Sequence, residues 1–174
     1  MKALIVVDVQ NGVYAYEGSE VLDGERTVAT INGLIARCRT AGCPVIFIQH
    51  EDDELLRGSE LWEPLSVLDA RTDDTVLSKR HGSAFHETPL DGLLRSAGVE
   101  EVVVCGMQTE YCVDSTCRHA LTLGYQVQLA SDAHTTFDSP ALSASQIMDH
   151  HNRTLASYCD ILPAESIAFA RTEP

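Results

Sequence analysis

Basic residues are scarce in this chain: 12 Lys and Arg stand against 26 Asp and Glu, and the formal net charge is −14. Such a surface lacks the cationic side chains that neutralise nucleic-acid phosphates or attract anionic membranes. We therefore expect neither nucleic acid nor a membrane as a partner, and we expect a small molecule instead.

Long hydrophobic runs are also missing. The first apolar run, residues 3–7, ends at Asp8, which makes it too short for the apolar region of a signal peptide or for a membrane span. The hydrophobic content of 44% is nevertheless too high for a disordered chain. We expect a cytoplasmic protein that folds as one domain over residues 1–174.

The six cysteines include no Cys-x-x-Cys pair, which removes support for a structural zinc site or a thioredoxin-like redox motif. A chain of this size, without an export signal, builds its core without a disulfide framework. We expect free thiols and predict no metal and no cofactor. A special role for any cysteine has to be argued from its surroundings.

Apolar residues occur in an order that alternates between strands and helices. The aliphatic run 2–8 is typical of a strand buried on both faces, and the stripe over 22–41 is helical. The expected strands are 2–8, 44–50, 74–79, 101–105, 125–130 and a short 161–162, and the expected helices are 22–41, 90–97, 109–123 and 140–158. This alternation predicts an α/β protein of three layers, α/β/α, with a Rossmann-like doubly wound parallel sheet of about six strands.

One long connection, residues 51–73, has no clear periodicity. Loops of this length in compact domains are usually functional or disordered, and this one contains Trp62, the only tryptophan. We expect it to shape a binding pocket.

Chemically capable residues follow the expected strands. In open α/β sheets, ligands bind beyond the carboxyl ends of the strands, where the strand order reverses. The residues expected at that edge are Asp8, Gln49, His50, Lys79, the segment 106–112 and the segment 132–134. An acid, a base and a thiol are therefore expected together at the end of the sheet where the carboxyl ends of the strands lie.

Cys112 is the most informative of these positions. It falls in the first turn of the predicted helix 109–123, with Thr109 as a suitable N-cap, and the free amides and positive dipole there stabilise a thiolate and can receive an oxyanion. The alternative for any cysteine is a small core side chain. That is our interpretation of Cys105 and Cys117, which lie in a buried strand and on an apolar helix face.

Asp8 and Lys79 form a set with Cys112. A carboxylate that closes an aliphatic strand needs a partner when buried, although it can also cap a turn or helix. Lys79 can alternatively be a solvated strand end. Together, a proton-accepting carboxylate, an ammonium that steadies a thiolate and a helix-terminal cysteine make a nucleophile with its base and orienting group.

Four segments resemble one known family, the isochorismatase-like cysteine hydrolases, which include nicotinamidases, N-carbamoylsarcosine amidase and streptothricin hydrolase-like proteins. The segments are Val-Val-Asp-Val-Gln at 6–10, Ser-Lys-Arg-His-Gly-Ser-Ala-Phe at 78–85, Val-Cys-Gly-Met-Gln-Thr-Glu-Tyr-Cys-Val at 104–113 and Ser-Asp-Ala-His-Thr at 131–135. The resemblance implies an Asp8, Lys79, Cys112 triad and the sheet order 3-2-1-4-5-6. It also implies an oxyanion hole from the N–H groups of Gln108 and Cys112, a cis peptide between Met107 and Gln108, and a homo-oligomer.

The metal-binding pattern of nicotinamidases is not reproduced here. Those enzymes carry Asp-x-His after the second strand, whereas this chain has Gln49 and His50 followed by two acids. We read the histidines as surface or hydrogen-bonded groups. The candidate pocket residues are Gln49, His50, Trp62, Phe85 and Tyr111, and each of them can instead be a core or surface residue.

The leading hypothesis is cysteine-dependent hydrolysis of a C–N amide bond in a small molecule, through a thioester on Cys112. Isochorismatase-type cleavage of a vinyl ether is an alternative in which the thiol is dispensable. A non-catalytic ligand-binding or assembly protein on the same fold is another. The acidic surface favours a neutral or cationic amide over a dianion such as isochorismate.

Overall fold

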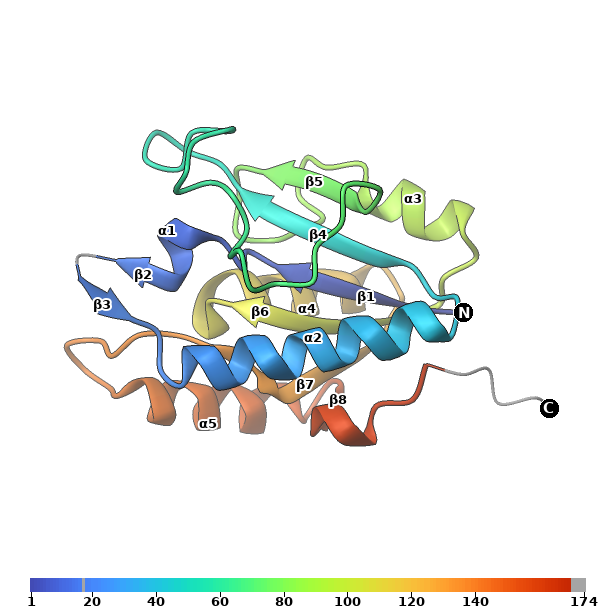
Figure 1. The fold of residues 1–174 in the computed structure, drawn as a ribbon. Coiled ribbons are helices and arrows are strands. Elements are labelled where there is room, and N and C mark those ends of the chain that lie inside the picture. The colour runs from blue at the N-terminus through green and yellow to red at the C-terminus, as the bar shows by residue number, and fades with distance from the viewer. Residues whose placement is uncertain (17, 170–174) are drawn as a thin grey trace.

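Six parallel strands form the central sheet of the computed structural model, which describes residues 1–16 and 18–169. The strands are β1 (Lys2–Val7), β4 (Val45–His50), β5 (Thr75–Lys79), β6 (Glu101–Met107), β7 (Gln126–Thr135) and β8 (Asp160–Leu162). They lie in the order β5-β4-β1-β6-β7-β8, so the predicted order 3-2-1-4-5-6 is confirmed (Figure 1).

Strand β1 shows why the sheet is buried on both sides. Its side chains alternate between two cores, with Leu4 and Val6 in one and Ala3, Ile5 and Val7 in the other. A continuous aliphatic sequence is therefore required, because neither face of the strand meets water.

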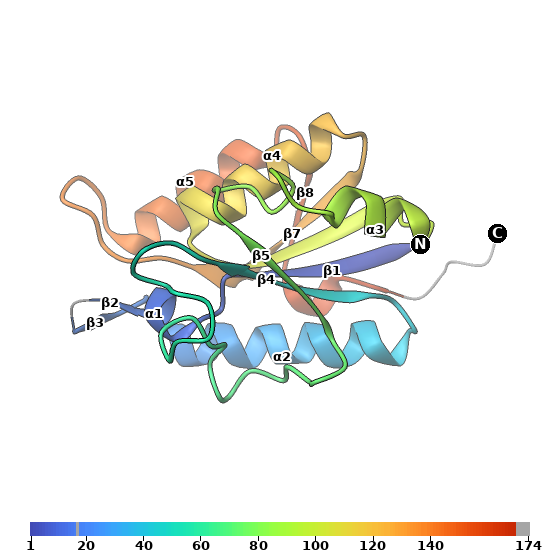
Figure 2. The same ribbon diagram turned by 90° about the horizontal axis from the view of Figure 1, so that it is seen from above.

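Helices cover both faces of the sheet, as the predicted three layers require (Figure 2). Helix α2 (Gly24–Thr40) packs on one face, and α3 (Leu90–Ser96), α4 (Asp114–Thr122) and α5 (Ala144–Leu155) lie over the other. A short 3₁₀ helix, η2 (Ala164–Ser166), packs beside α2. No helix among the described residues is long and apolar enough to span a membrane.

Three of the expected helices and strands differ from the observed ones in helix type or by more than two residues. The predicted helix 109–123 begins as a five-residue π-helix, η1 (Thr109–Val113), and continues as α4. The predicted strand 125–130 extends to Thr135 in β7. The predicted helix 140–158 is shorter, because Ser143 caps α5 in a capping box with Gln146 and leaves Pro140 outside.

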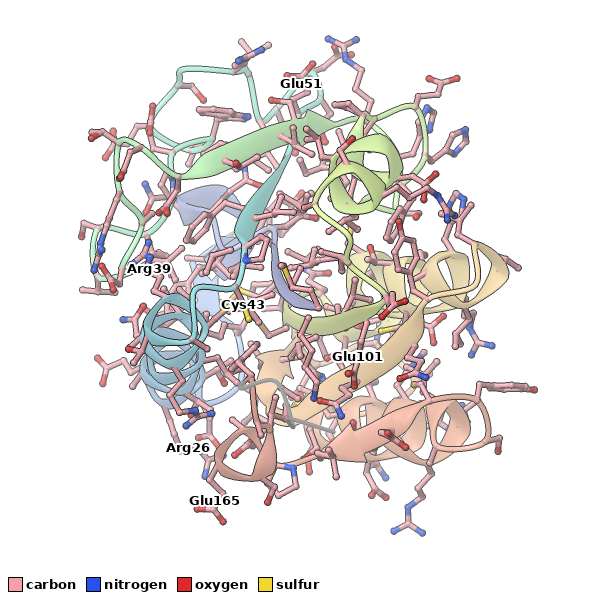
Figure 3. The ribbon with its side chains drawn as sticks, turned by 90° about the vertical axis from the view of Figure 1, so that its right-hand side faces the viewer. Arg26, Arg39, Cys43, Glu51, Glu101 and Glu165 are labelled. Atoms are coloured by element: carbon pink, nitrogen blue, oxygen red, sulfur yellow. The ribbon has the colours of Figure 1, made fainter. Side chains whose placement is uncertain are left out.

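A layer of short segments covers the carboxyl ends of the strands. It consists of α1 (Asn11–Tyr14), the hairpin of β2 (Ala15–Tyr16) and β3 (Ser19–Glu20), and the first part of the connection 51–74 (Figure 1). The rest of this connection runs back on the α2 side of the sheet to the start of β5 (Figure 2). Gly12 allows close packing here, since a Cβ on it would lie 2.5 Å from Leu55 Cδ2. The opposite end of the sheet, where the strands begin, is seen in Figure 3, with Cys43 just before β4 and Glu101 at the start of β6.

Candidate active site

Asp8 is placed by the pairing of β1 with its two neighbours. It follows β1 directly, and its N–H donates to the main-chain oxygen of Ile48 in β4. Its backbone is left-handed, with φ 51°, a conformation that Asp adopts more readily than most residues. On the other side, Gly106 of β6 pairs with Val7 so closely that a Cβ on it would lie 2.0 Å from the Val7 oxygen. Asp8 is thereby fixed at the point where the strand order reverses.

Lys79 reaches this point from the last residue of β5, two strands away. Its side chain is fully buried, so the alternative of a solvated strand end is excluded. The Nζ atom lies 2.7 Å from Asp8 Oδ2 and 3.2 Å from Cys112 Sγ. The structure thus brings together the three residues of the expected triad.

His50, at the end of β4, is the third group around the ammonium. Its Nδ1 lies 3.1 Å from Lys79 Nζ, and its Nε2 lies 3.3 Å from Asp52 Oδ2. An ammonium can only donate, so Nδ1 accepts and the imidazole proton sits on Nε2, facing Asp52. Burial, and then the charge of Lys79, lower the pKa of His50, which keeps the ring neutral.

Burial has a large influence on the protonation states of the groups in the site. Desolvation, followed by the charge of Asp8, raises the pKa of the Cys112 thiol to about 12, and Lys79 opposes this only in part. Burial alone would lower the pKa of Lys79, but Asp8 and Cys112 outweigh it, and the net shift is upward. Burial thus favours the thiol form of Cys112 beside a cationic Lys79, which opposes the stabilisation of a thiolate expected from the start of the helix.

A buried network holds the segment that carries Cys112. The Thr109 hydroxyl lies 2.8 Å from His134 Nδ1, and His134 Nε2 lies 2.9 Å from Asn152 Oδ1, which ties η1 to β7 and α5. Burial lowers the pKa of His134 to about 4, so its ring is neutral. Thr109 is therefore a buried hydrogen-bonding residue rather than the expected N-cap, a position that Gln108 occupies.

A cavity of about 510 Å³ opens onto Cys112 and Asp8. The peptide bond between Met107 and Gln108, at the end of β6, is cis, and Gln108 lines the cavity. Among the described residues, the lining consists of Asp8, Gly12, Val13, Ala15, Tyr16, His50, Asp52, Glu54, Leu55, Leu61, Gln108, Tyr111 and Cys112. Most of these residues come from α1, β2 and the connection 51–74, as expected for a long functional loop.

The predicted pocket residues divide into two groups. His50 and Tyr111 line the cavity, whereas Gln49, Trp62 and Phe85 do not. Gln49 instead donates through Nε2 to the Trp62 main-chain oxygen at 2.9 Å, which holds the loop against β4. Phe85 lies in the core and stacks on the Tyr125 ring, with 5.8 Å between centroids.

Gln10 is an organising residue to which sequence reasoning assigned no role, although it lies in the first family segment. It is fully buried, and its Nε2 donates to the main-chain oxygens of His50 and Trp62. Its Oε1 accepts from the His50 N–H at 2.7 Å. Gln10 thereby joins β1, β4 and the loop at the edge of the site.

In the part of the chain that the structure describes, two groups of side chains have the composition of metal ligands. Asp8, His50 and Cys112 place their potential ligand atoms within 4.8 Å of one another. Lys79 Nζ lies 2.7–3.2 Å from an atom of each of these residues, so a metal ion held by them would have to displace the ammonium. His81, His86 and Glu87 form the second group, on the surface between β5 and α3.

Comparison with known proteins gives a consistent result. The family model of the isochorismatase domain matches residues 2–154. Streptothricin hydrolase of Streptomyces noursei is 38% identical over an alignment of 148 residues that covers 81% of this chain and 52% of that protein, so the chain spans about half the length of this relative.

Two further matches extend over more of the other protein. Nicotinamidase 3 of Arabidopsis thaliana is 30% identical over 153 residues, covering 78% of this chain and 74% of that one. A crystal structure of an isochorismatase family protein superposes with a TM-score of 0.89 at 34% identity, covering 92% of this chain and 97% of the other. The chain thus belongs to the isochorismatase family of hydrolases, which includes amidohydrolase relatives.

Proposed function

We propose that the protein hydrolyses a C–N amide bond of a small molecule through a thioester intermediate on Cys112. The observation that carries the proposal is the shared contact of Asp8 and Cys112 with the buried ammonium of Lys79 at the inner end of the cavity. A carboxylate, a thiol and a fixed positive charge in one desolvated place are the parts that nucleophilic catalysis by cysteine requires.

The first half of the reaction uses Asp8 as the base. Because the pKa of Cys112 is raised to about 12, its thiol needs a base during attack, and Asp8 takes the proton as sulfur bonds to the substrate carbonyl carbon. The carbonyl oxygen becomes negative and accepts from the N–H groups of Gln108 and Cys112. The C–N bond then breaks, Asp8 returns the proton to nitrogen, and the amine leaves.

The second half reverses these roles with water. Asp8 takes a proton from a water molecule, the hydroxide oxygen bonds to the thioester carbon, and the same N–H groups hold the second oxyanion. The C–S bond breaks, sulfur recovers the proton from Asp8, and a carboxylic acid is released. Lys79 stays cationic throughout and offsets the negative charge on sulfur and oxygen.

The experiment is a substrate panel of small amides, ureas, lactams and isochorismate, assayed with wild type, Cys112→Ala and Cys43→Ala. We expect turnover of an amide or lactam that Cys112→Ala reduces by at least 10³-fold. Cys43→Ala is the matched control, because Cys43 is a half-buried thiol that does not line the cavity. Turnover that survives in Cys112→Ala would reject the mechanism and favour vinyl ether chemistry.

A further inference from the structure

We propose that the outer wall of the cavity binds a positive charge on the substrate, with Asp52 as the principal contact and Glu54 beside it. This inference rests on the proposed function for its account of the scissile bond. It adds the substrate class: a primary amide or lactam that carries an ammonium, amidinium or guanidinium group a few bonds away.

The charges that line the cavity are of one sign. Among the described residues, the lining includes Asp8, Asp52 and Glu54 but no Lys or Arg. The negative charge of Asp8 is balanced by Lys79, which lies behind the lining and has its three N–H donors directed at three acceptors. Asp52 and Glu54 therefore give the open part of the cavity a negative field that no lining cation offsets.

Asp52 is held in place before any ligand arrives. Its Oδ1 accepts the N–H groups of Glu54 at 2.8 Å and Leu55 at 2.7 Å, and its Oδ2 faces the protonated Nε2 of His50. The hydrogen bond from Leu55 is the main reason that the pKa of Asp52 is lowered, so the carboxylate stays charged. A preorganised carboxylate costs little further ordering when it binds a cation.

Four arginines lie in the connection 51–74 or form ion pairs with it, and none of them lines the cavity. Arg39 and Arg71 pair with Asp69. Arg80 Nε lies 2.9 Å from Glu51 Oε1, and the Arg57 guanidinium lies 5.9 Å from the centre of the Trp62 ring. Neither side chain lines the cavity.

A second observation indicates that a hydrogen-bond donor of the substrate lies beside Asp8 at the inner end of the cavity. Asp8 is 2% exposed, and its Oδ1 is buried without a hydrogen-bond partner among the described residues. Such an atom favours a ligand N–H. The same lining includes the apolar side chains of Val13, Leu55 and Leu61. A ligand that combines an amide N–H, an aliphatic part and a cation matches this set of lining residues.

The first test measures the field at Cys112 without requiring amidase activity. Methanethiosulfonates that carry a trimethylammonium, a methyl or a sulfonate group react with a thiolate by forming a mixed disulfide and releasing methanesulfinate. The rates are measured in a Cys43→Ala/Cys159→Ala background, which removes the other two half-buried thiols. Division by the rates with 2-mercaptoethanol corrects for intrinsic reactivity.

We expect the corrected rate of the cationic reagent to exceed that of the anionic reagent by at least tenfold. Asp52→Asn should reduce this ratio about fivefold. Asp53→Asn is the matched control, because Asp53 is an exposed acid of the same loop that does not line the cavity, and it should change the ratio less than twofold. Equal rates, or equal effects of Asp52→Asn and Asp53→Asn, would overturn the proposal.

The second test uses three amides of one length: 6-aminohexanamide, heptanamide and the monoamide of heptanedioic acid. We expect the highest kcat/KM for 6-aminohexanamide, with the preference expressed in KM and reduced about fivefold by Asp52→Asn. Amide turnover without charge preference would overturn the cation site and leave the proposed function intact. A cationic preference in the thiosulfonate rates without turnover of any amide would support the cation site and count against the proposed function.

Discussion

The buried ion pair of Lys79 and Asp8 offers a quantitative test of the site's architecture. Lys79→Met removes the ammonium and leaves a carboxylate that is 2% exposed without its 2.7 Å partner. Breaking such a pair from one side costs about 3–5 kcal/mol of unfolding free energy, because one charge remains buried and uncompensated. The thiol of Cys112 and Nδ1 of His50 lose a hydrogen-bond donor in the same step.

Removal of both charges should recover much of this loss. Asp8→Asn is the appropriate second change, since Asn is nearly isosteric and tolerates the left-handed backbone at φ 51°. In the double variant neither charge is buried alone, so we expect a coupling free energy of at least about 2 kcal/mol. The double variant should therefore be more stable than the sum of the single effects predicts.

Urea unfolding of the wild type, the two single variants and the double variant measures this coupling. Arg153 and Asp149 form a matched control on the surface of α5, with Nε 2.9 Å from Oδ2 and both side chains more than half exposed, and they should show no measurable coupling. Additive effects of Lys79→Met and Asp8→Asn would refute the reasoning, because the two groups would then contribute independently.

Three further predictions concern stability and the loop. The pKa of His134 is about 4 in the folded protein and 6.5 in the unfolded chain, so the stability that neutral His134 provides is complete above pH 6.5 and falls by about 3 kcal/mol as the pH drops to 4. In His134→Gln, the free energy of unfolding measured with urea should change less with pH over this range. Gly106→Ala should prevent folding or lower the free energy of unfolding by more than about 3 kcal/mol, because its Cβ would lie 2.0 Å from the Val7 oxygen. Gly92→Ala, at an open position of a helix, should instead raise the free energy of unfolding by up to about 1 kcal/mol, and thermal unfolding measures both changes. Arg39→Met removes the ion pairs with Asp69 at 2.7 Å and Asp74 at 2.5 Å. It should lower the free energy of unfolding by about 1–2 kcal/mol and increase the rate of limited proteolysis within residues 51–74, and an unchanged cleavage rate would contradict this.

Local sequence predicted the layers of the fold because burial on both faces of a parallel sheet leaves a strong signal. The aliphatic residues of β1 and the helical stripe of α2 are examples. The signal fails for α1 and for the hairpin of β2 and β3, which have four residues and two residues per strand. Elements so short show no periodicity, and they are held by tertiary bonds such as Gly12 N–H to the Leu61 oxygen.

Part of the candidate site was predictable from the sequence. Asp8, Lys79 and Cys112 were identified by their positions after the expected strands and at a helix start, the family segments contain all three, and the structure brings them together. The contact of Lys79 with His50 follows from the register of β4 and β5, in which these two residues are partners, and strand register is not encoded in either segment alone. Asp52 and Glu54 line the cavity because of the path of the connection after β4, for which the sequence has no periodic pattern, so they were not recognised as cavity residues.

Trapping of the covalent intermediate tests the central claim most directly. Wild-type protein is mixed with an amide substrate from the panel, quenched in acid within milliseconds, and digested for mass spectrometry. We expect an acyl group, of the mass of the substrate less its amine, on the peptide that contains Cys112, and no such adduct in Cys112→Ala. Substrate turnover at an undiminished rate in Cys112→Ala, with no acyl group on any wild-type peptide, would contradict it.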